Sequence, residues 1–172
     1  VQNPNYKRHD TLGWNYRMNE FTAAVALAQV EQLEQKVNKR IENANALLDL
    51  ISDYEVLIPQ KVPKNYTHSY YTLACRLNPD INWQKFRKIF NENGGEGFYS
   101  AWSVPYLEPL MVNRSFNNRF DSKFRIKEYK KGECPIAEDL QSEIIQFKTN
   151  YLTKKDIYRQ AKALKRTLLY FK

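Results

Sequence analysis

The stretch from residue 19 to residue 52 limits the possible folds more than any other part of the sequence, because it contains neither glycine nor proline. Its apolar residues recur at spacings of mostly three and four, which places them on one side of an α-helix. Asn19 is a suitable N-cap, and Glu20 adds a negative charge to the first turn. An unbroken helix of this length would extend roughly 50 Å, so we expect part of it to pack on another domain or subunit; the alternative is a break midway. The apolar stripe consists of Phe21, Ala24, Ala28, Val30, Leu33, Val37, Ile41, Ala44, Leu48 and Ile51.

The rest of the chain alternates between short extended and short helical patterns. Asn82 and Thr153 are suitable N-caps for the second and the last of the helices, and Gly94-Gly95 is suited to end the helix that Asn82 begins. Residues 105–134 show no clear period and are expected to be mostly loop. This order of elements predicts an α+β fold, with helices against a small antiparallel sheet. We expect strands over 54–58, 69–77 and 98–104, and further helices over 83–93, 135–145 and 154–169.

Composition narrows the partners without choosing one. The chain has 27 Lys and Arg against 19 Asp and Glu, a formal net charge of +8, which favours nucleic acid, membrane surfaces or phosphorylated small molecules. Its two cysteines, Cys75 and Cys134, form no zinc pattern, so no metal is expected. Cys75 lies in an extended pattern and is expected to be a small buried residue. No apolar run approaches the roughly 20 residues that span a bilayer, and we expect a cytoplasmic protein with no membrane partner.

The segment just before the long helix carries the strongest candidate for a binding site. It reads Gly13-Trp14-Asn15-Tyr16-Arg17-Met18. A loop that enters a helix N-terminus gathers free N–H groups at the positive end of the helix dipole. Asn15 adds an amide donor, and the guanidinium of Arg17 suits phosphate or carboxylate. The segment could therefore bind an anion, although its spacing alone favours an ordinary capped helix with Arg17 in a local salt bridge.

These residues also resemble those of a known family. The run Gly13 to Met18, followed by Glu20 and the pair Ala23-Ala24, resembles the stretch after the catalytic lysine in the DegT/DnrJ/EryC1/StrS sugar aminotransferases. Further segments resemble the family in the same order along the chain. They are Gln29 and Gln32-Leu33, Arg40 with Ala44, His68-Ser69-Tyr70-Tyr71, Gly94-Gly95-Glu96-Gly97-Phe98-Tyr99, Pro105-Tyr106-Leu107-Glu108-Pro109 and Cys134-Pro135-Ile136-Ala137-Glu138.

The resemblance implies a pyridoxal-phosphate (PLP) enzyme of fold type I that works as a homodimer with active sites between the subunits. Asn15 then corresponds to the residue that contacts the PLP phosphate of the neighbouring subunit. Arg17 becomes a second candidate for phosphate or substrate binding, with local structure as the alternative. His68 is expected near the substrate sugar, and Tyr99 is a further candidate for a substrate contact.

The implied reaction transfers an amino group, usually from glutamate, to a keto group of a nucleotide-linked sugar, in the biosynthesis of polysaccharide or glycoconjugate precursors. A nucleotide diphosphate would also account for part of the positive charge. Seven basic residues lie between Arg114 and Lys131, against the acidic residues Asp121 and Glu128. Some of them are candidates for binding the diphosphate, and a solvated charged loop is the alternative.

The chain departs from the family in one respect. The lysine that holds the cofactor is expected upstream of Gly13, and Lys7 lacks the serine and glycine pattern that surrounds such a lysine. No catalytic residue is therefore assigned within this chain, which we do not expect to be active alone. The implied organisation is an irregular arm over 1–18, a long linking helix over 19–53 and a small C-terminal α+β domain over 54–172.

Two functions of other classes remain open at this point. A nucleic-acid-binding module would use the positive charge and the aromatic side chains, but these do not interleave regularly and no nucleic-acid motif is found. A helical association module would use the stripe over residues 19–52, although the stripe lacks clean heptads with charged flanks.

Overall fold

A computed structural model describes residues 16–100, 104–112 and 128–172. The chain divides into two compact units, residues 1–35 and residues 36–172, and each is considered by itself. The elements in chain order are α1 (Glu20–Val30), α2 (Leu33–Ile51), β1 (Leu57–Pro59), β2 (Leu73–Leu77), α3 (Trp83–Glu92), β3 (Tyr99–Ser100), the 3-10 helix η1 (Pro105–Leu107), α4 (Pro109–Val112), α5 (Pro135–Gln141), β4 (Ile144–Phe147) and α6 (Lys154–Tyr170).

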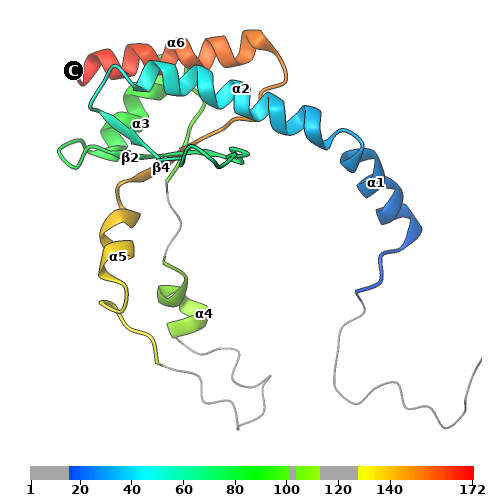
Figure 1. Ribbon diagram of the computed structural model, residues 1–172. Coiled ribbons are helices and arrows are strands. Elements are labelled where there is room, and N and C mark those ends of the chain that lie inside the picture. The colour runs from blue at the N-terminus through cyan, green and yellow to red at the C-terminus, as the bar shows by residue number, and fades with distance from the viewer. Residues whose placement is uncertain (1–15, 101–103, 113–127) are drawn as a thin grey trace, which may run out of the picture. The chain divides into compact units, whose positions relative to one another are not determined.

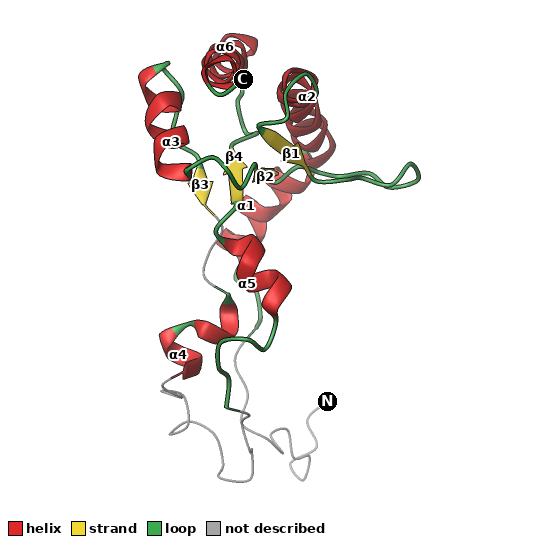
Figure 2. Cartoon of the chain, turned by 90° about the vertical axis from the view of Figure 1, so that its left-hand side faces the viewer, coloured by secondary structure: helices red, strands yellow, loops and turns green. Residues whose placement is uncertain are grey.

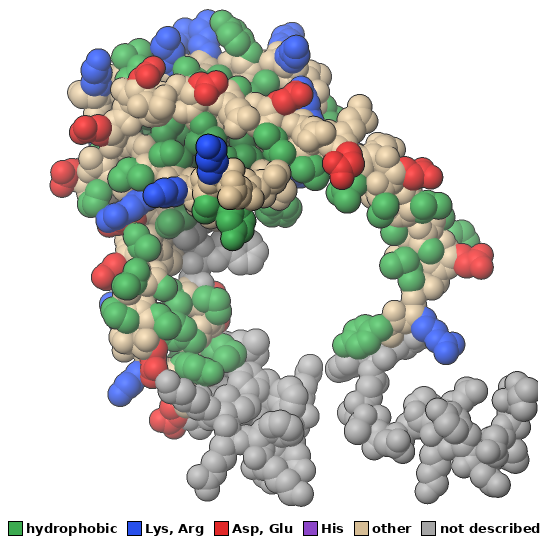
Figure 3. All heavy atoms as spheres, in the orientation of Figure 1, with side chains coloured by type: hydrophobic (Ala, Val, Ile, Leu, Met, Phe, Trp, Pro, Cys, Tyr) green, Lys and Arg blue, Asp and Glu red, His purple; other side chains and the backbone are tan. Residues whose placement is uncertain are grey.

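The first unit contains α1, which is apolar but exposed. Asn19 caps it as predicted, because its side-chain oxygen accepts a hydrogen bond from the backbone N–H of Thr22 at 2.9 Å. No residue of α1 is buried, and the Phe21 side chain is 88% exposed. Figure 3 shows hydrophobic side chains along the surface of this helix. An apolar helix without a buried side is suited to packing against other polypeptide.

The helix expected over residues 19–52 is interrupted once. Glu31 and Gln32 form a turn between α1 and α2. Neither glycine nor proline marks this position, so the break lay beyond the reach of local sequence signals. The two helices differ in side-chain burial. In α2, four residues are buried, Asn43, Ala44, Leu47 and Ile51, whereas no residue of α1 is buried.

The second unit is built on a four-stranded antiparallel sheet in the order β1-β2-β4-β3. The expected α+β class is confirmed. The interpretation of residues 135–145 as one helix was wrong at its end, because α5 stops at Gln141 and β4 begins at Ile144. β4 lies inside the sheet, where Ile145 pairs with Cys75 of β2 on one side and with Ser100 of β3 on the other.

Helices α2, α3 and α6 cover one face of this sheet (Figures 1 and 2). Large side chains fill the core between these helices and the sheet, and that of Phe86 is fully buried. The Phe86 ring lies 5.6 Å from the ring centroids of both Phe98 and Phe171. Sheet residues that face this core alternate along β2, where Leu73, Cys75 and Leu77 are buried. The apolar faces of the helices and of the sheet, which follow from their periodicities, therefore form a single cluster of buried residues.

Local capping signals give the helix ends as predicted. The side chain of Asn82 accepts from the N–H of Lys85 at the start of α3, and that of Thr153 accepts from the N–H of Asp156 at the start of α6. Helix α3 ends in a Schellman motif. The N–H of Gly94 donates to the Asn91 carbonyl and the N–H of Gly95 to the Phe90 carbonyl, both at 2.9 Å. Gly94 has a φ of 89°, which a residue without Cβ adopts at little cost.

The structure tests two further predictions, for Tyr71 and for Cys75 of β2. Tyr71 was expected inside a strand with Leu73 and Cys75, but β2 begins only at Leu73 and Tyr71 is 80% exposed. Cys75 is buried as predicted, and burial raises the pKa of its thiol to about 12. Within the described ranges, no helix is both long enough and apolar enough to cross a bilayer.

Candidate functional site

The segment before α1 is described only in part. Asn15 lies outside the described residues, whereas Arg17 is exposed and takes part in an interaction. In the first turn of α1, the Asn19 side chain accepts the N–H of Thr22, and Glu20 carries a negative charge. An anion placed at the end of the helix would compete with the Asn19 side chain and with the charge of Glu20. The donors that fit a phosphate chemically are the amide of Asn15 and the guanidinium of Arg17, ahead of the helix.

His68 lies in the loop between β1 and β2, which extends away from the sheet in Figure 2. Its Nδ1 accepts a hydrogen bond from the backbone N–H of Tyr70 at 2.8 Å. The His68 and Tyr70 rings are 4.3 Å apart between centroids. Tyr70 has a φ of 46°, the one positive value among non-glycine residues in the described ranges. His68 is therefore part of an unusual, tightly bonded turn rather than of a strand.

Sequence reasoning missed the residues that hold this turn in place. The Thr149 hydroxyl donates to the Tyr70 carbonyl at 2.6 Å, and the Arg40 guanidinium donates to the Tyr71 carbonyl at 2.9 Å and to Thr149 Oγ1 at 3.1 Å. Arg40 was singled out only as part of a family resemblance. No local pattern could show that a residue of α2 and a residue after β4 meet at one turn, because 109 positions separate them.

Tyr99 is the first residue of β3 and pairs with Gln146 of β4. This pairing places its backbone at the edge of the sheet, in a different segment from His68. The nearby Glu96 has a structural role. Its carboxylate forms ion pairs with Lys148 at 3.3 Å and Arg159 at 2.9 Å. These ion pairs connect the loop before β3 to the residue after β4 and to α6.

The segments over 105–109 and 134–138, which lie apart in the sequence, are joined by a hydrogen bond between Tyr106 and Glu138. We call these two residues the Tyr106–Glu138 pair. The Tyr106 hydroxyl donates to the Glu138 carboxylate and accepts from the Cys134 N–H at 3.0 Å. Glu138 also accepts from the N–H of Gly132 at 2.7 Å. These bonds hold η1 against the start of α5. Most of the basic stretch from Arg114 to Lys131 lies outside the described residues.

The Tyr106–Glu138 pair should be stable only in a defined pH range. The Tyr106 hydroxyl lowers the pKa of Glu138 below its ordinary 4.5, and partial burial followed by the Glu138 hydrogen bond raises the pKa of Tyr106 to about 12. The stabilisation is therefore complete between the ordinary pKa values of 4.5 and 10.0. It is lost as the pH falls through the lowered pKa of Glu138 or rises through the raised pKa of Tyr106.

Absorbance of tyrosinate during an alkaline titration measures this shift. The amplitude that Tyr106→Phe removes should lie near pH 12, and Tyr158→Phe, which removes a tyrosine that is 71% exposed, serves as the matched control. If the amplitude removed with Tyr106 instead titrates near pH 10.0, the hydrogen bond to Glu138 is not made in solution.

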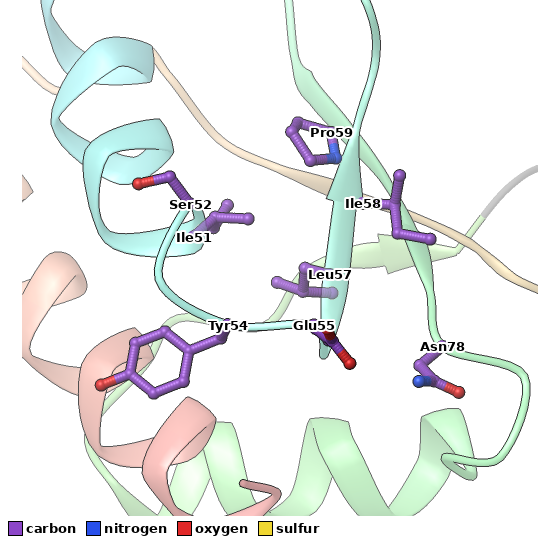
Figure 4. A pocket seen from close by; sticks show the side chains of 8 residues that line it. All are labelled: Ile51, Ser52, Tyr54, Glu55, Leu57, Ile58, Pro59 and Asn78. Carbon is purple, nitrogen blue, oxygen red and sulfur yellow. The ribbon is translucent and has the colours of Figure 1, made fainter.

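One hollow of the second unit does not suit an anion. This hollow, of about 430 Å³, lies between the end of α2, β1 and the residue after β2. Figure 4 shows its lining, which is mostly apolar and has Ser52, Glu55 and Asn78 as its polar members. It carries a carboxylate and no basic side chain, so a phosphate would be repelled there. Among the described residues, no group of three or more His, Cys, Asp and Glu is placed to hold a metal ion.

Comparison with known proteins gives a consistent result. The model of the DegT/DnrJ/EryC1/StrS aminotransferase family matches residues 1–165. One curated relative is a dTDP-4-dehydro-2,3,6-trideoxy-D-glucose 4-aminotransferase of Saccharopolyspora spinosa, 28% identical over 63% of this chain and 27% of its own length. Another is a GDP-perosamine synthase of Escherichia coli O157:H7, 24% identical over 77% of this chain and 31% of its own length.

Solved structures agree on the fold. The crystal structure of an aminotransferase from Psychrobacter cryohalolentis superposes with a TM-score of 0.68 at 22% identity, over 95% of this chain and 42% of that one. The chain thus spans between about a quarter and a third of the two curated relatives. The likeness to the solved structure extends over nearly the whole of this sequence.

Proposed function

The chain belongs to the DegT/DnrJ/EryC1/StrS aminotransferase family, and from this premise we propose that it is the C-terminal part of an enzyme that transfers an amino group to a keto carbon of a nucleotide-linked sugar. The observation that carries the proposal is the family match over residues 1–165. The names of the two curated relatives refer to a dTDP-linked sugar and to a GDP-linked sugar. We extend that substrate class to this chain, with glutamate as the amino donor and a polysaccharide or glycoconjugate precursor as the product.

We propose that Asn15 and Arg17 bind the phosphate of PLP. The amide N–H of Asn15 and the guanidinium of Arg17 are donors of the kind that oxyanions accept. The cofactor, when bound, supplies the electron sink for moving the amino group. The chain's own residues then bind and orient: Asn15 and Arg17 hold the phosphate, while His68 and Tyr99 are assigned to the sugar substrate by family resemblance.

We propose that the lysine that holds the cofactor belongs to polypeptide outside these 172 residues. The support is the coverage, since the chain matches 27% and 31% of the lengths of its two curated relatives. We therefore assign the activity to the complete enzyme and not to these 172 residues alone.

We further propose that the complete enzyme is a homodimer in which Asn15 reaches the cofactor of the partner. The support is the resemblance of residues 13–18 to a family motif that acts across the subunit interface, together with the exposed apolar surface of α1. Phe21 and Val30 are 88% and 64% exposed. Covering such apolar side chains with another polypeptide lowers the free energy, because their surface is removed from water.

Replacing Asn15 by alanine in the complete enzyme should weaken PLP retention by about tenfold or more, because a hydrogen bond to a charged group contributes roughly 1.5–3 kcal/mol. Retention is measured from the cofactor absorbance that remains after dialysis. Asn45→Ala is the matched control, because Asn45 is an exposed residue of α2. Retention equal to that of Asn45→Ala would remove Asn15 from the site.

A mixing experiment tests the contact across subunits. A hybrid of one Asn15→Ala subunit and one subunit without the cofactor lysine contains one complete site if Asn15 acts on its neighbour. At a limiting PLP concentration, activity should then rise above that of both parent homodimers when the two are unfolded, mixed and refolded. Activity of the isolated hybrid no greater than that of the Asn15→Ala homodimer would contradict the shared site.

A further inference from the structure

The turn that carries His68 is held by bonds from two distant elements. The Thr149 hydroxyl donates to the Tyr70 carbonyl at 2.6 Å, and Thr149 itself is fully buried. The Arg40 guanidinium donates to the Tyr71 carbonyl at 2.9 Å and lies over the Tyr71 ring, with Cζ 5.5 Å from the ring centroid. Both carbonyls of the turn are therefore fixed from outside it.

Thr149 is itself held in register by α2. Asn43 Nδ2 donates to the carbonyls of Thr149 and Tyr151, both at 2.8 Å. Arg40, one helical turn earlier on α2, donates to Thr149 Oγ1 at 3.1 Å. The hydroxyl of Thr149 thus accepts from Arg40 and donates its own proton to the Tyr70 carbonyl, with the Tyr71 carbonyl at 3.3 Å as a second acceptor.

The same turn imposes a strained conformation on Tyr70. A φ of 46° is unfavourable for a residue with a Cβ and a large ring. Such strain persists where the surrounding structure over-determines it, and it is concentrated at functional sites. Here the bonds from Thr149 and Arg40 supply that constraint.

The conformation has a chemical consequence for His68. The backbone N–H of Tyr70 points at Nδ1 of His68 at 2.8 Å, so Nδ1 acts as an acceptor. In a neutral imidazole the proton is then on Nε2, which becomes a donor. Stacking on the Tyr70 ring, with 4.3 Å between centroids, fixes the orientation of the imidazole plane. Within the part of the chain that the structure describes, Nε2 of His68 has no hydrogen-bond partner.

We propose that Thr149 and Arg40 are positioning residues for His68, and that they hold the turn over residues 68–71 so that the neutral imidazole presents its Nε2–H to an oxygen of the nucleotide-linked sugar. The identity of the acceptor rests on the proposed function. The fixed tautomer rests on the geometry of the turn alone. The two parts are therefore tested separately.

The first experiment is nuclear magnetic resonance on the full 172-residue chain labelled with ¹⁵N. The chain contains two histidines, His9 and His68, so His68→Gln assigns the signals. At a pH where the ring is neutral, His68 should have its proton on Nε2. A scalar coupling across the hydrogen bond should connect its Nδ1 to the Tyr70 amide. A protonated Nδ1, or no coupling to Tyr70, would overturn the proposal.

Variants of Thr149 separate positioning from simple folding. Thr149→Val keeps the shape and removes the hydroxyl, so it should abolish the coupling and speed hydrogen exchange of the Tyr70 amide by about tenfold or more. Thr149→Ser keeps the hydroxyl and should restore both. Should the valine variant fail to fold, Arg40→Lys, which removes the planar guanidinium, should reduce the coupling instead. A coupling unchanged in a folded valine variant would exclude the positioning role.

The second experiment uses the complete PLP-loaded enzyme and adds dTDP-glucose, which carries the nucleotide, diphosphate and sugar. The Nε2–H signal of His68 should shift in the wild-type enzyme, and the shift should be at least about threefold smaller at equal probe concentration in Thr149→Val. If the coupling to Tyr70 is present and the probe binds without moving this signal, the fixed donor stands and the sugar contact is wrong. If neither dTDP-glucose nor a GDP-linked sugar binds, the proposed function itself is at fault.

Discussion

Replacing Phe86 by alanine should lower the free energy of unfolding by about 3–5 kcal/mol, the largest effect that we expect from a single substitution in this chain. The Phe86 side chain is fully buried on α3. Its ring packs 5.6 Å from both the Phe98 ring and the Phe171 ring, measured between centroids. Alanine would lose the transfer free energy of the ring and leave a cavity that three elements cannot close.

Urea denaturation followed by circular dichroism measures this loss. Phe21→Ala removes the same side chain from α1, where it is 88% exposed, and should change the free energy of unfolding by less than about 0.5 kcal/mol. Equal losses for the two variants would show that the core does not close around Phe86.

Replacing Asn43 by alanine should cost about 2–4 kcal/mol, although the side chain is polar. Asn43 is 2% exposed, and its Nδ2 donates to the carbonyls of Thr149 and Tyr151 at 2.8 Å each. Alanine would leave both carbonyls without their donor in a site with little access to water. A buried acceptor that loses its partner costs more free energy than the same bond contributes on average.

The matched control is Asn45→Ala on the exposed side of α2, which should be close to neutral. The amide exchange of Tyr70 gives a second measurement, because Asn43 holds the segment that carries Thr149, and Thr149 bonds to the Tyr70 carbonyl. A loss in Asn43→Ala no greater than in Asn45→Ala would mean that water satisfies the two carbonyls.

Local sequence signals predicted the ends of the helices and not the order of the strands. Asn19, Asn82 and Thr153 cap helices as expected because each bond is made within three residues of the cap. β4 was missed because Ile144–Phe147 has only four residues and is separated from the end of α5 by just two residues. Its assignment depends on pairing with β2 and β3, which lie far away in the sequence.

The candidate site divides in the same way. The sequence singled out His68 and Arg40 as separate resemblances, and Tyr106 and Glu138 as members of two motifs. The bonds of Arg40 to the turn after His68 and the contact between Tyr106 and Glu138 appear only in the structure. A sequence pattern contains no distances between its residues. It therefore singled out candidate residues but did not predict which of them are in contact.

The sequence by itself determined the α+β class, the helix caps, the burial of Cys75 and the family. These follow from periodicity, hydrogen bonds within three residues and an ordered series of motifs. Only the tertiary structure decided where the long helix breaks, that β4 completes the sheet, and that Thr149 and Arg40 hold the turn of His68. For the sheet and the turn, the physical reason is that they depend on contacts between segments up to 109 residues apart, and such contacts stabilise the chain only once it has folded. For the helix, neither glycine nor proline stands at the break between Val30 and Leu33.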